Sequence, residues 1–103
     1  MKIRRMEEND IEAVKDVYAE AFERNRSSLK YYPGFDTYVG FCIDQGYAFV
    51  AEDEDKAVGI IFGYIKPDAF RGRAAYIEVL AVIPEYQNRG IGKSLISKIE
   101  IPV

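Results

Sequence analysis

The segment Gln-Asn-Arg-Gly-Ile-Gly at residues 87–92 constrains this chain most, because it separates two stretches of different periodicity. Residues 74–83 before it form an apolar, strand-like run, and residues 91–99 after it form an amphipathic, helix-like run. Glycines in a strand-to-helix turn let the backbone approach an anion closely, and the helix start directs free N–H groups and its positive dipole end to the same point. Lys93 and Arg89 add two positive charges beside the turn. The pattern therefore predicts a phosphate-binding turn.

The rest of the chain predicts further strands and helices. The candidate strands are residues 1–6, 47–52, 57–66 and 74–83, and the candidate helices are a segment from Asn9, residues 36–43 and residues 91–99. Asn9 and Glu12 suit a capping box at the start of the first helix. Residues 24–35 and 67–73 contain turn formers and are predicted as loops, whereas the acidic turn at 53–56 suggests an antiparallel hairpin. The expected order is therefore strand, helix, short helix, three strands and helix.

Length and composition favour one small domain, residues 1–103, built around a single core. The chain carries 14 basic and 17 acidic residues, for a net charge of −3, and they are interspersed, so no basic face is expected to bind nucleic acid. No stretch resembles a signal peptide or approaches the ~20 apolar residues of a membrane span, which favours a cytoplasmic protein without membrane contact. With no histidine and one cysteine, Cys42, we expect no metal site and a buried thiol.

Two other glycine motifs compete for the same turn. Gly92, Lys93 and Ser94 match the end of a Walker A loop, but the first glycine of that motif would stand at Gln87, and no second strand supplies a magnesium-binding aspartate. The dinucleotide fingerprint needs a third glycine where Leu95 stands. A tight turn without a ligand remains the simplest alternative. The residues around the turn must therefore distinguish between these interpretations.

Residues 76–96 resemble the acetyl-CoA-binding motif of the GCN5-related N-acetyltransferase (GNAT) family. The resemblance combines a Leu-Ala-Val strand end, a proline and an aromatic residue in the connecting loop, the Gln-x-x-Gly-x-Gly turn and an apolar helix at the expected spacing. It implies an α/β (α+β) fold with a mixed, largely antiparallel sheet flanked by helices in the order β-α-α-β-β-β-α. It also implies an acetyl-CoA-dependent N-acetyltransferase, acting without a metal on a primary amine of a small molecule or peptide by direct attack in a ternary complex.

The resemblance also implies where acetyl-CoA binds. Backbone groups of Leu80 and Val82 would pair with the pantetheine arm like an added strand, and an amide near Leu80 would stabilise the thioester oxyanion. The pyrophosphate would be held by the turn and the first helical turn, with the side chains of Gln87 and Arg89 beside it. The residues of that turn are Gln87, Asn88, Arg89, Gly90, Ile91, Gly92 and Lys93.

Glu78 is the candidate acceptor for the proton that the attacking amine loses. Strand alternation would place it on one face with Tyr76, Leu80 and Val82, and a carboxylate in such an apolar run needs a partner or a use. An exposed Glu78 without a function is the competing interpretation. Tyr76 is a second candidate for the base. Three loop aromatics lie where the family binds its acceptor, although core packing would explain them equally: Tyr31, Tyr32 and Phe35.

Complete members of the family continue past this helix with a strand, a helix and a final pair of strands, whereas this sequence ends at Val103. The chain is therefore expected to be a C-terminally truncated acetyltransferase domain. Its strand at 74–83 would be left as an exposed apolar edge, and Leu95, Ile96 and Ile99 would lack part of their cover, which predicts a homodimer. A non-catalytic CoA-binding or interaction module is the alternative function.

Overall fold

The computed structural model describes residues 1–22, 29 and 32–99, so Tyr31, predicted near the acceptor, lies outside the described residues. The elements are β1 (Lys2–Arg5), the 3-10 turn η1 (Glu8–Asp10), α1 (Ile11–Ala21), α2 (Phe35–Gln45), β2 (Ala48–Asp53), β3 (Lys56–Asp68), β4 (Gly72–Val82), the 3-10 turn η3 (Pro84–Tyr86) and α3 (Ile91–Ile96). The predicted order of strands and helices is confirmed. Their ends differ from the predicted ones by up to three residues, and α3 is the element that is shortened most.

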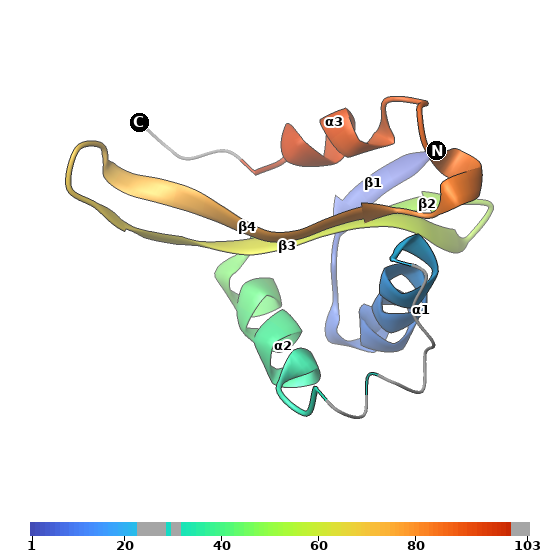
Figure 1. Ribbon diagram of the computed structural model, residues 1–103, viewed down its shortest axis with the longest axis horizontal. Helices are drawn as coiled ribbons and strands as arrows, with labels where there is room; N and C mark the ends of the chain where they lie inside the picture. Colours follow the sequence, from blue (N-terminus) through green and yellow to red (C-terminus); the bar gives the residue numbers. More distant parts are fainter. Residues whose placement is uncertain (23–28, 30–31, 100–103) are drawn as a thin grey trace.

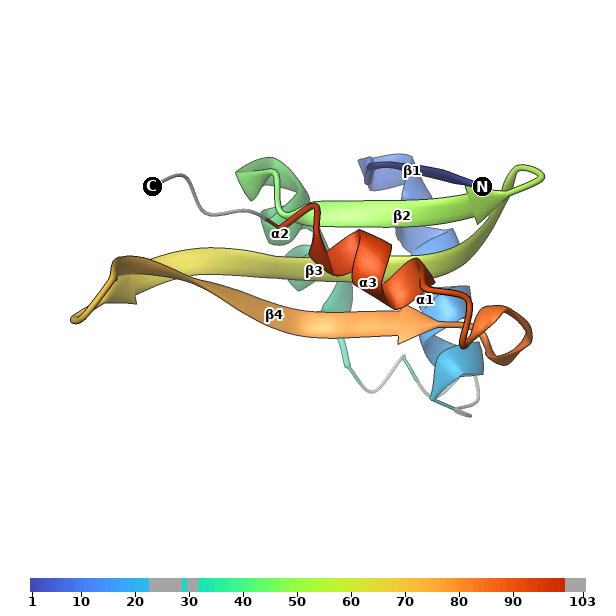
Figure 2. The ribbon, with the colours of Figure 1, turned by 90° about the horizontal axis from the view of Figure 1, so that it is seen from above.

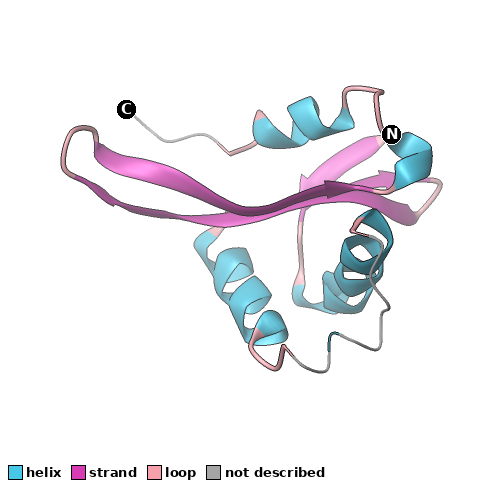
Figure 3. Ribbon diagram, in the orientation of Figure 1, coloured by secondary structure: helices cyan, strands magenta, loops and turns pink. Residues whose placement is uncertain are grey.

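The described strands form one antiparallel sheet in the order β1-β2-β3-β4, which confirms the predicted fold class. α1 and α2 pack on one face of this sheet and α3 packs on the other, which gives three layers (Figures 1 and 3). The apolar side chains of the inner strands are buried between these layers: Ala48, Val50, Ala51, Val58, Ile60, Ile61 and Phe62. Cys42 of α2 is buried in the same core, as predicted.

α3 lies close to the sheet because the strand beneath it carries a glycine. A Cβ atom at Gly59 of β3 would lie 3.2 Å from both Ile91 Cγ2 and Leu95 Cδ1. Seen from above, the helix runs over this part of the sheet (Figure 2). Leu95 is fully buried there, so the prediction that it lacks cover is wrong, whereas Ile96 is 44% exposed. Ile99 is partly buried against the core.

A bulge interrupts the pairing of β4 with β3. Phe62 of β3 pairs with Val79, and the next residue, Gly63, pairs with Ile77. Glu78 is therefore an extra residue in β4 without a pairing partner. Such a bulge bends the strand and reverses the alternation of its side chains.

The bulge changes which face of the sheet Glu78 occupies. Val82 pairs with Gly59, which lies beneath α3, so Val82 and Leu80 are on the α3 face. Glu78 instead lines a pocket together with Val79 on the face of α1 and α2. The prediction that Glu78 shares a face with Leu80 and Val82 is wrong, because unbroken alternation does not hold across the bulge.

An ion cluster joins β1 to the start of α1 and to β2. The guanidinium of Arg4 contacts both carboxylate oxygens of Asp10 at 2.8 Å and also contacts Glu52. Asp10 in addition accepts a backbone N–H from the residue before η1 at 2.7 Å, and it stands as the N-cap of α1. The predicted capping by Asn9 and Glu12 is wrong, because hydrogen bonds between Glu7 and Asp10 form a capping box and close a 3-10 turn ahead of the helix.

β3 and β4 extend past the other strands as a long hairpin (Figures 1 and 2). Residues 67–73, predicted as a loop, contribute to both strands, and Pro67 pairs with Arg73. β2 does not reach this part of β3, so the missing N–H of Pro67 removes no hydrogen bond to β2. Asp68 closes the tip, where its Oδ1 accepts the N–H of Phe70 at 2.8 Å.

Candidate functional site

β4 lies at the edge of the described sheet and has a strand partner on one side. The N–H of Ile83 donates to the carbonyl oxygen of Val58 at 2.9 Å, which directs the backbone groups of Ile83 toward β3. By alternation, the N–H and C=O groups of Leu80 and Val82 point to the open edge. This edge therefore has the geometry to pair with an extended ligand in the manner of an added strand.

Between β4 and α3 the backbone forms a concave turn. Asn88 and Gly90 have φ angles of 64° and 82°, in the left-handed region that asparagine and glycine tolerate best. Left-handed residues in such a turn bring successive N–H groups to one side, as in an anion-binding nest. The first described helical hydrogen bond runs from Ser94 N–H to Gly90 O, so the N–H groups of residues 91–93 have no acceptor within α3. Lys93 is exposed at the same end of the helix.

The side chains around the turn differ in what they contact. Gln87 Nε2 donates to the carbonyl oxygen of Val82 at 2.9 Å, so this side chain fastens the turn to the end of β4. The guanidinium of Arg89 lies 4.9 Å from the ring centroid of Tyr86, and the Tyr86 hydroxyl donates to Asp53 Oδ2 at 2.7 Å. The loop is thus held to both β4 and β2, and Arg89 stays at the surface beside the turn.

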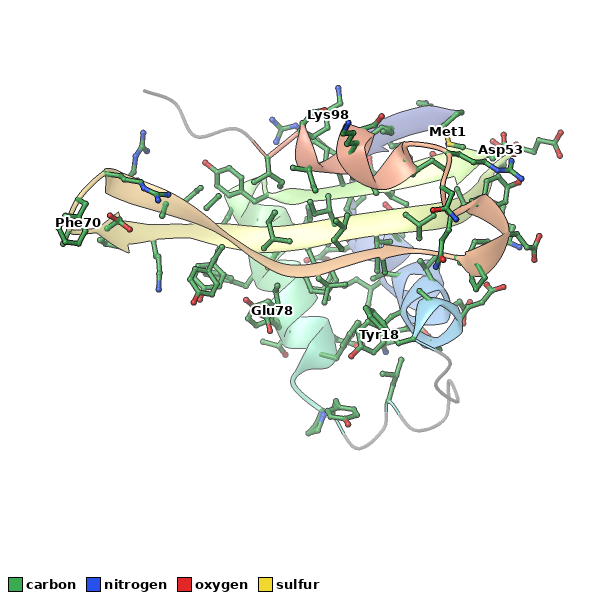
Figure 4. All side chains as sticks on the ribbon, turned by 45° about the horizontal axis from the view of Figure 1, so that its top comes forward. Met1, Tyr18, Asp53, Phe70, Glu78 and Lys98 are labelled. Carbon is green, nitrogen blue, oxygen red and sulfur yellow. The ribbon has the colours of Figure 1, made fainter. Side chains whose placement is uncertain are left out.

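A pocket of about 450 Å³ lies on the other face of the sheet, between α1, α2 and the strands β3 and β4. Aromatic side chains form most of its walls: Tyr18, Tyr32, Phe35, Tyr38 and Phe62. The other described lining residues are Leu29, Pro33, Gly34, Val79 and Glu78. Glu78 and Tyr18 lie on the same side of the sheet as α1 and α2 (Figure 4). The structure therefore brings the predicted residues Glu78, Tyr32 and Phe35 together.

Glu78 has a direct partner on α2. The Tyr38 hydroxyl donates to Glu78 Oε2 at 3.4 Å, a long hydrogen bond on an exposed carboxylate. Burial raises the pKa of Tyr38 well above its ordinary value, and the negative charge of Glu78 raises it further. Tyr38 therefore stays protonated and serves as a donor to the carboxylate. The same two causes raise the pKa of Cys42 to about 11, so the thiol stays neutral.

Tyr76, the second candidate base, is not among the described lining residues of the pocket. Its ring stacks on Tyr64 with the centroids 5.6 Å apart, and Lys66 Nζ lies 4.1 Å from its ring centroid. The side chain is 47% exposed. Its position on the long hairpin thus separates it from the cavity that Glu78 borders.

The sequence pattern does not single out Tyr38 or Tyr18 for this site. Tyr18 falls on the apolar face of a predicted helix, where core packing is the ordinary interpretation. Tyr38 stands in a series of aromatic residues at every third position, with Tyr32, Phe35 and Phe41. Side chains three residues apart are neighbours on a helix, so the pair Phe35 and Tyr38 is the signal that could have pointed to an aromatic wall.

Within the described ranges 1–22, 29 and 32–99, no group of three or more His, Cys, Asp or Glu residues could hold a metal ion. Among the helices described, none has both the length and the apolar character needed to cross a bilayer.

The model of the acetyltransferase (GNAT) family matches residues 11–101 of this chain. No curated protein sequence gives a significant match. A putative acetyltransferase from Pyrococcus horikoshii superposes with a TM-score of 0.72 and 21% identity, over 94% of this chain and 32% of that one. The PaiA N-acetyltransferase from Thermoplasma acidophilum, in complex with coenzyme A, gives a TM-score of 0.72 and 18% identity over 94% of this chain and 67% of that one.

A plant protein shares the same fold. Arabidopsis thaliana Naa50, in complex with the bisubstrate analogue CoA-Ac-MVNAL, superposes with a TM-score of 0.70 and 21% identity, over 95% of this chain and 60% of that one. This chain thus spans from about a third to about two thirds of the length of these three proteins. At such identities the structural likeness establishes the fold, and the family model establishes the membership.

Proposed function

Since the chain belongs to the GNAT family of acetyltransferases, we propose that it transfers an acetyl group from acetyl-CoA to a primary amine by direct attack in a ternary complex. The observation that carries the proposal is the position of Glu78, a carboxylate at the bulge of an edge strand that borders an aromatic pocket. The amine would enter through the pocket, and acetyl-CoA would lie along the edge of β4. The two substrates would then meet beside the bulge, and holding them together supplies much of the catalysis.

Acetyl-CoA would bind mainly through backbone groups. The pantetheine arm would pair with the outward N–H and C=O groups of Leu80 and with the N–H of Val82, whose carbonyl accepts Gln87 Nε2. The pyrophosphate would accept hydrogen bonds from backbone N–H groups of residues 88–93, where the left-handed turn and the start of α3 converge. Arg89 and Lys93 would add positive charge, and Gln87 would keep the turn in place through its bond to Val82.

The chemistry would need one proton acceptor and one oxyanion donor. The amine nitrogen would attack the thioester carbon, an amide bond would form, and the carbon–sulfur bond would break with release of the CoA thiolate. An outward N–H near Leu80 would stabilise the oxyanion. Glu78 would take the proton that the nitrogen loses, and Tyr38 would hold this carboxylate in place. Tyr76 remains the second candidate for the base.

The acceptor would be an amine of a small molecule or a peptide. The bisubstrate analogue bound to the Arabidopsis neighbour supports the inclusion of peptides. We expect residues 1–103 to act as a single acetyltransferase domain in the cytoplasm, without nucleic acid or membrane partners. Interspersed charges with a net value of −3 support the absence of a nucleic acid partner.

A homodimer is the proposed assembly. The outer side of β4 has no strand partner among the described residues, and two apolar residues on β4 and α3 are exposed, Ile77 at 41% and Ile96 at 44%. A second copy could cover both features by pairing edge to edge.

A thermal-shift titration with acetyl-CoA, CoA and ATP tests the proposed function, followed by thiol release in the presence of pooled primary amines. We expect acetyl-CoA and CoA to raise the melting temperature more than ATP does, and thiol release to require an added amine. Stabilisation by CoA without amine-dependent release would favour the non-catalytic CoA-binding module. Stronger protection by ATP would favour a nucleotide-binding turn instead.

A further inference from the structure

The pocket beside Glu78 has one charged side chain among its described lining residues. One oxygen of that carboxylate accepts the Tyr38 hydroxyl at 3.4 Å. An ionised carboxylate has about four acceptor sites, so Glu78 can still receive hydrogen bonds from a cation. A single carboxylate neutralises a single ammonium group.

The rest of the pocket favours an apolar group. The ring centroid of Phe35 lies 5.4 Å from that of Tyr18 and 6.1 Å from that of Phe62, both with an edge turned to a face. Apolar ligand atoms gain by leaving water against such walls. The volume of about 450 Å³ is near the small end of the usual range for small-molecule sites, about 300–1,000 Å³. It therefore suits one compact group.

We propose that the acceptor is a singly charged primary amine attached to a compact apolar group, such as an aromatic ring. Its ammonium group binds Glu78, and its apolar group lies against Phe35, Tyr38 and Phe62. The transfer step in this inference rests on the proposed function, but the binding step does not. The same chemistry occurs in a free arylalkylamine and in a peptide that begins with an aromatic residue.

The pocket disfavours two other kinds of amine. A polyamine brings several charged groups to a wall whose described residues offer one carboxylate, so the additional charges lose water without an anionic partner. A free amino acid carries a carboxylate next to its amine, and this group would lie near Glu78, where like charges repel.

The test compares 2-phenylethylamine, a phenylalanyl dipeptide amide, phenylalanine, ethylamine and spermidine. Transfer is measured as amine-dependent thiol release, and binding is measured by ligand-observed NMR without acetyl-CoA. We expect kcat/KM for 2-phenylethylamine or the dipeptide amide to exceed that for ethylamine and spermidine about ten-fold or more. The kcat/KM for phenylalanine should be lower than those for 2-phenylethylamine and the dipeptide amide, because these two compounds lack a carboxylate near the amine. Whichever of 2-phenylethylamine and the dipeptide amide has the higher kcat/KM identifies the acceptor as a free amine or as a peptide.

Glu78→Gln should weaken binding of the preferred aromatic amine about ten-fold or more, because the ammonium group loses its charged partner. Glu8→Gln is the matched control, since Glu8 is exposed and outside the pocket. Tyr38→Phe keeps the ring and should keep the preference for an aromatic amine. If an aromatic amine binds in a Glu78-dependent manner but no amine is acetylated, the substrate class stands and the proposed transfer fails. If both aromatic amines fail to bind, or ethylamine or spermidine is preferred, the inference is overturned even where acetyl transfer occurs.

Discussion

Glu78 is an extra residue in its strand, is exposed, and meets a neutral tyrosine hydroxyl at 3.4 Å. A carboxylate held by such a long bond can accept a proton from an amine without breaking a strong ion pair. We predict that Glu78→Gln lowers the rate of acetyl transfer about 10²-fold or more near neutral pH and leaves acetyl-CoA affinity unchanged. The rate should recover partly at higher pH, where the amine is already neutral. If the rates of the wild-type and variant proteins coincide across this pH range, Glu78 does not accept the proton.

Gly63 permits the bulge that carries Glu78. A Cβ atom at Gly63 would lie 2.0 Å from the carbonyl oxygen of Tyr76, so any side chain forces the two strands apart. We predict that Gly63→Ala lowers the free energy of unfolding by about 1–3 kcal/mol and reduces acetyl transfer by displacing Glu78. Gly40→Ala is the matched control, because a Cβ there meets nothing within 4 Å. In the middle of α2 this control should raise stability by about 0.5–1 kcal/mol. Urea unfolding checks both, and similar effects of the two changes would contradict the argument.

At the scale of elements, the turn into α3 can be changed without disturbing the fold. A Cβ atom at Gly92 would meet no other atom within 4 Å, and its φ is not in the left-handed region. We predict that Gly92→Asp abolishes CoA binding by placing a carboxylate against the pyrophosphate, while the ligand-free melting temperature does not fall, because an acid at a helix start is favourable. Gly92→Ala should keep most of the affinity. Thermal-shift titration measures both, and unchanged affinity in Gly92→Asp would remove the proposed phosphate site.

The link between β1 and α1 should make stability depend on pH. The hydrogen bonds from Arg4 are the largest cause of a pKa for Asp10 below its ordinary value of 3.8. The pair therefore stabilises the fold fully at pH above this value, and the contribution is lost as the pH falls toward the lower folded-state pKa. Arg4→Met should lower the free energy of unfolding by about 1–2 kcal/mol at pH 7 and by less at low pH. Lys98→Met is the control, because Lys98 is exposed, and it should change the free energy of unfolding little at either pH. An equal cost of Arg4→Met at both pH values in urea unfolding would exclude this linkage.

The elements differ in how far the sequence predicts them. The strand, turn and helix around residues 87–92 were predictable because proline and glycine act on their own neighbours in the chain. The bulge at Glu78 was not, because it depends on the absence of a side chain at Gly63, on another strand. The helix start differs from the predicted one because Glu7 and Asp10, rather than Asn9 and Glu12, form the capping box, and Arg4 of β1 binds the same Asp10. The aromatic pocket needs α1, α2 and the sheet together, so local pattern indicates the rings but not the cavity that they form.

For the whole molecule, the two edges of the sheet differ in how they resist association. β1 is short and carries Lys2, Arg4 and Arg5, features that discourage pairing with another strand. β4 is longer, and its outer side has no described strand partner. We predict a dimer at tens of micromolar in sedimentation velocity, weakened by Ile77→Lys. Phe70→Ser at the tip of the hairpin, where the ring is 98% exposed (Figure 4), should leave the dimer intact. A monomer at these concentrations would contradict the proposed assembly.

A strand edge can pair with one occupant at a time. If the pantetheine arm and a second protomer both use the outward groups of Leu80 and Val82, then protein and acetyl-CoA concentrations oppose each other by mass action. Saturating acetyl-CoA would convert dimers into monomers, and the apparent dissociation constant for acetyl-CoA would rise as the protein is concentrated. Activity per molecule would then be highest in dilute solution. Because both would bind the open side of β4, each copy of the protein would be a competitive inhibitor of acetyl-CoA binding to another copy.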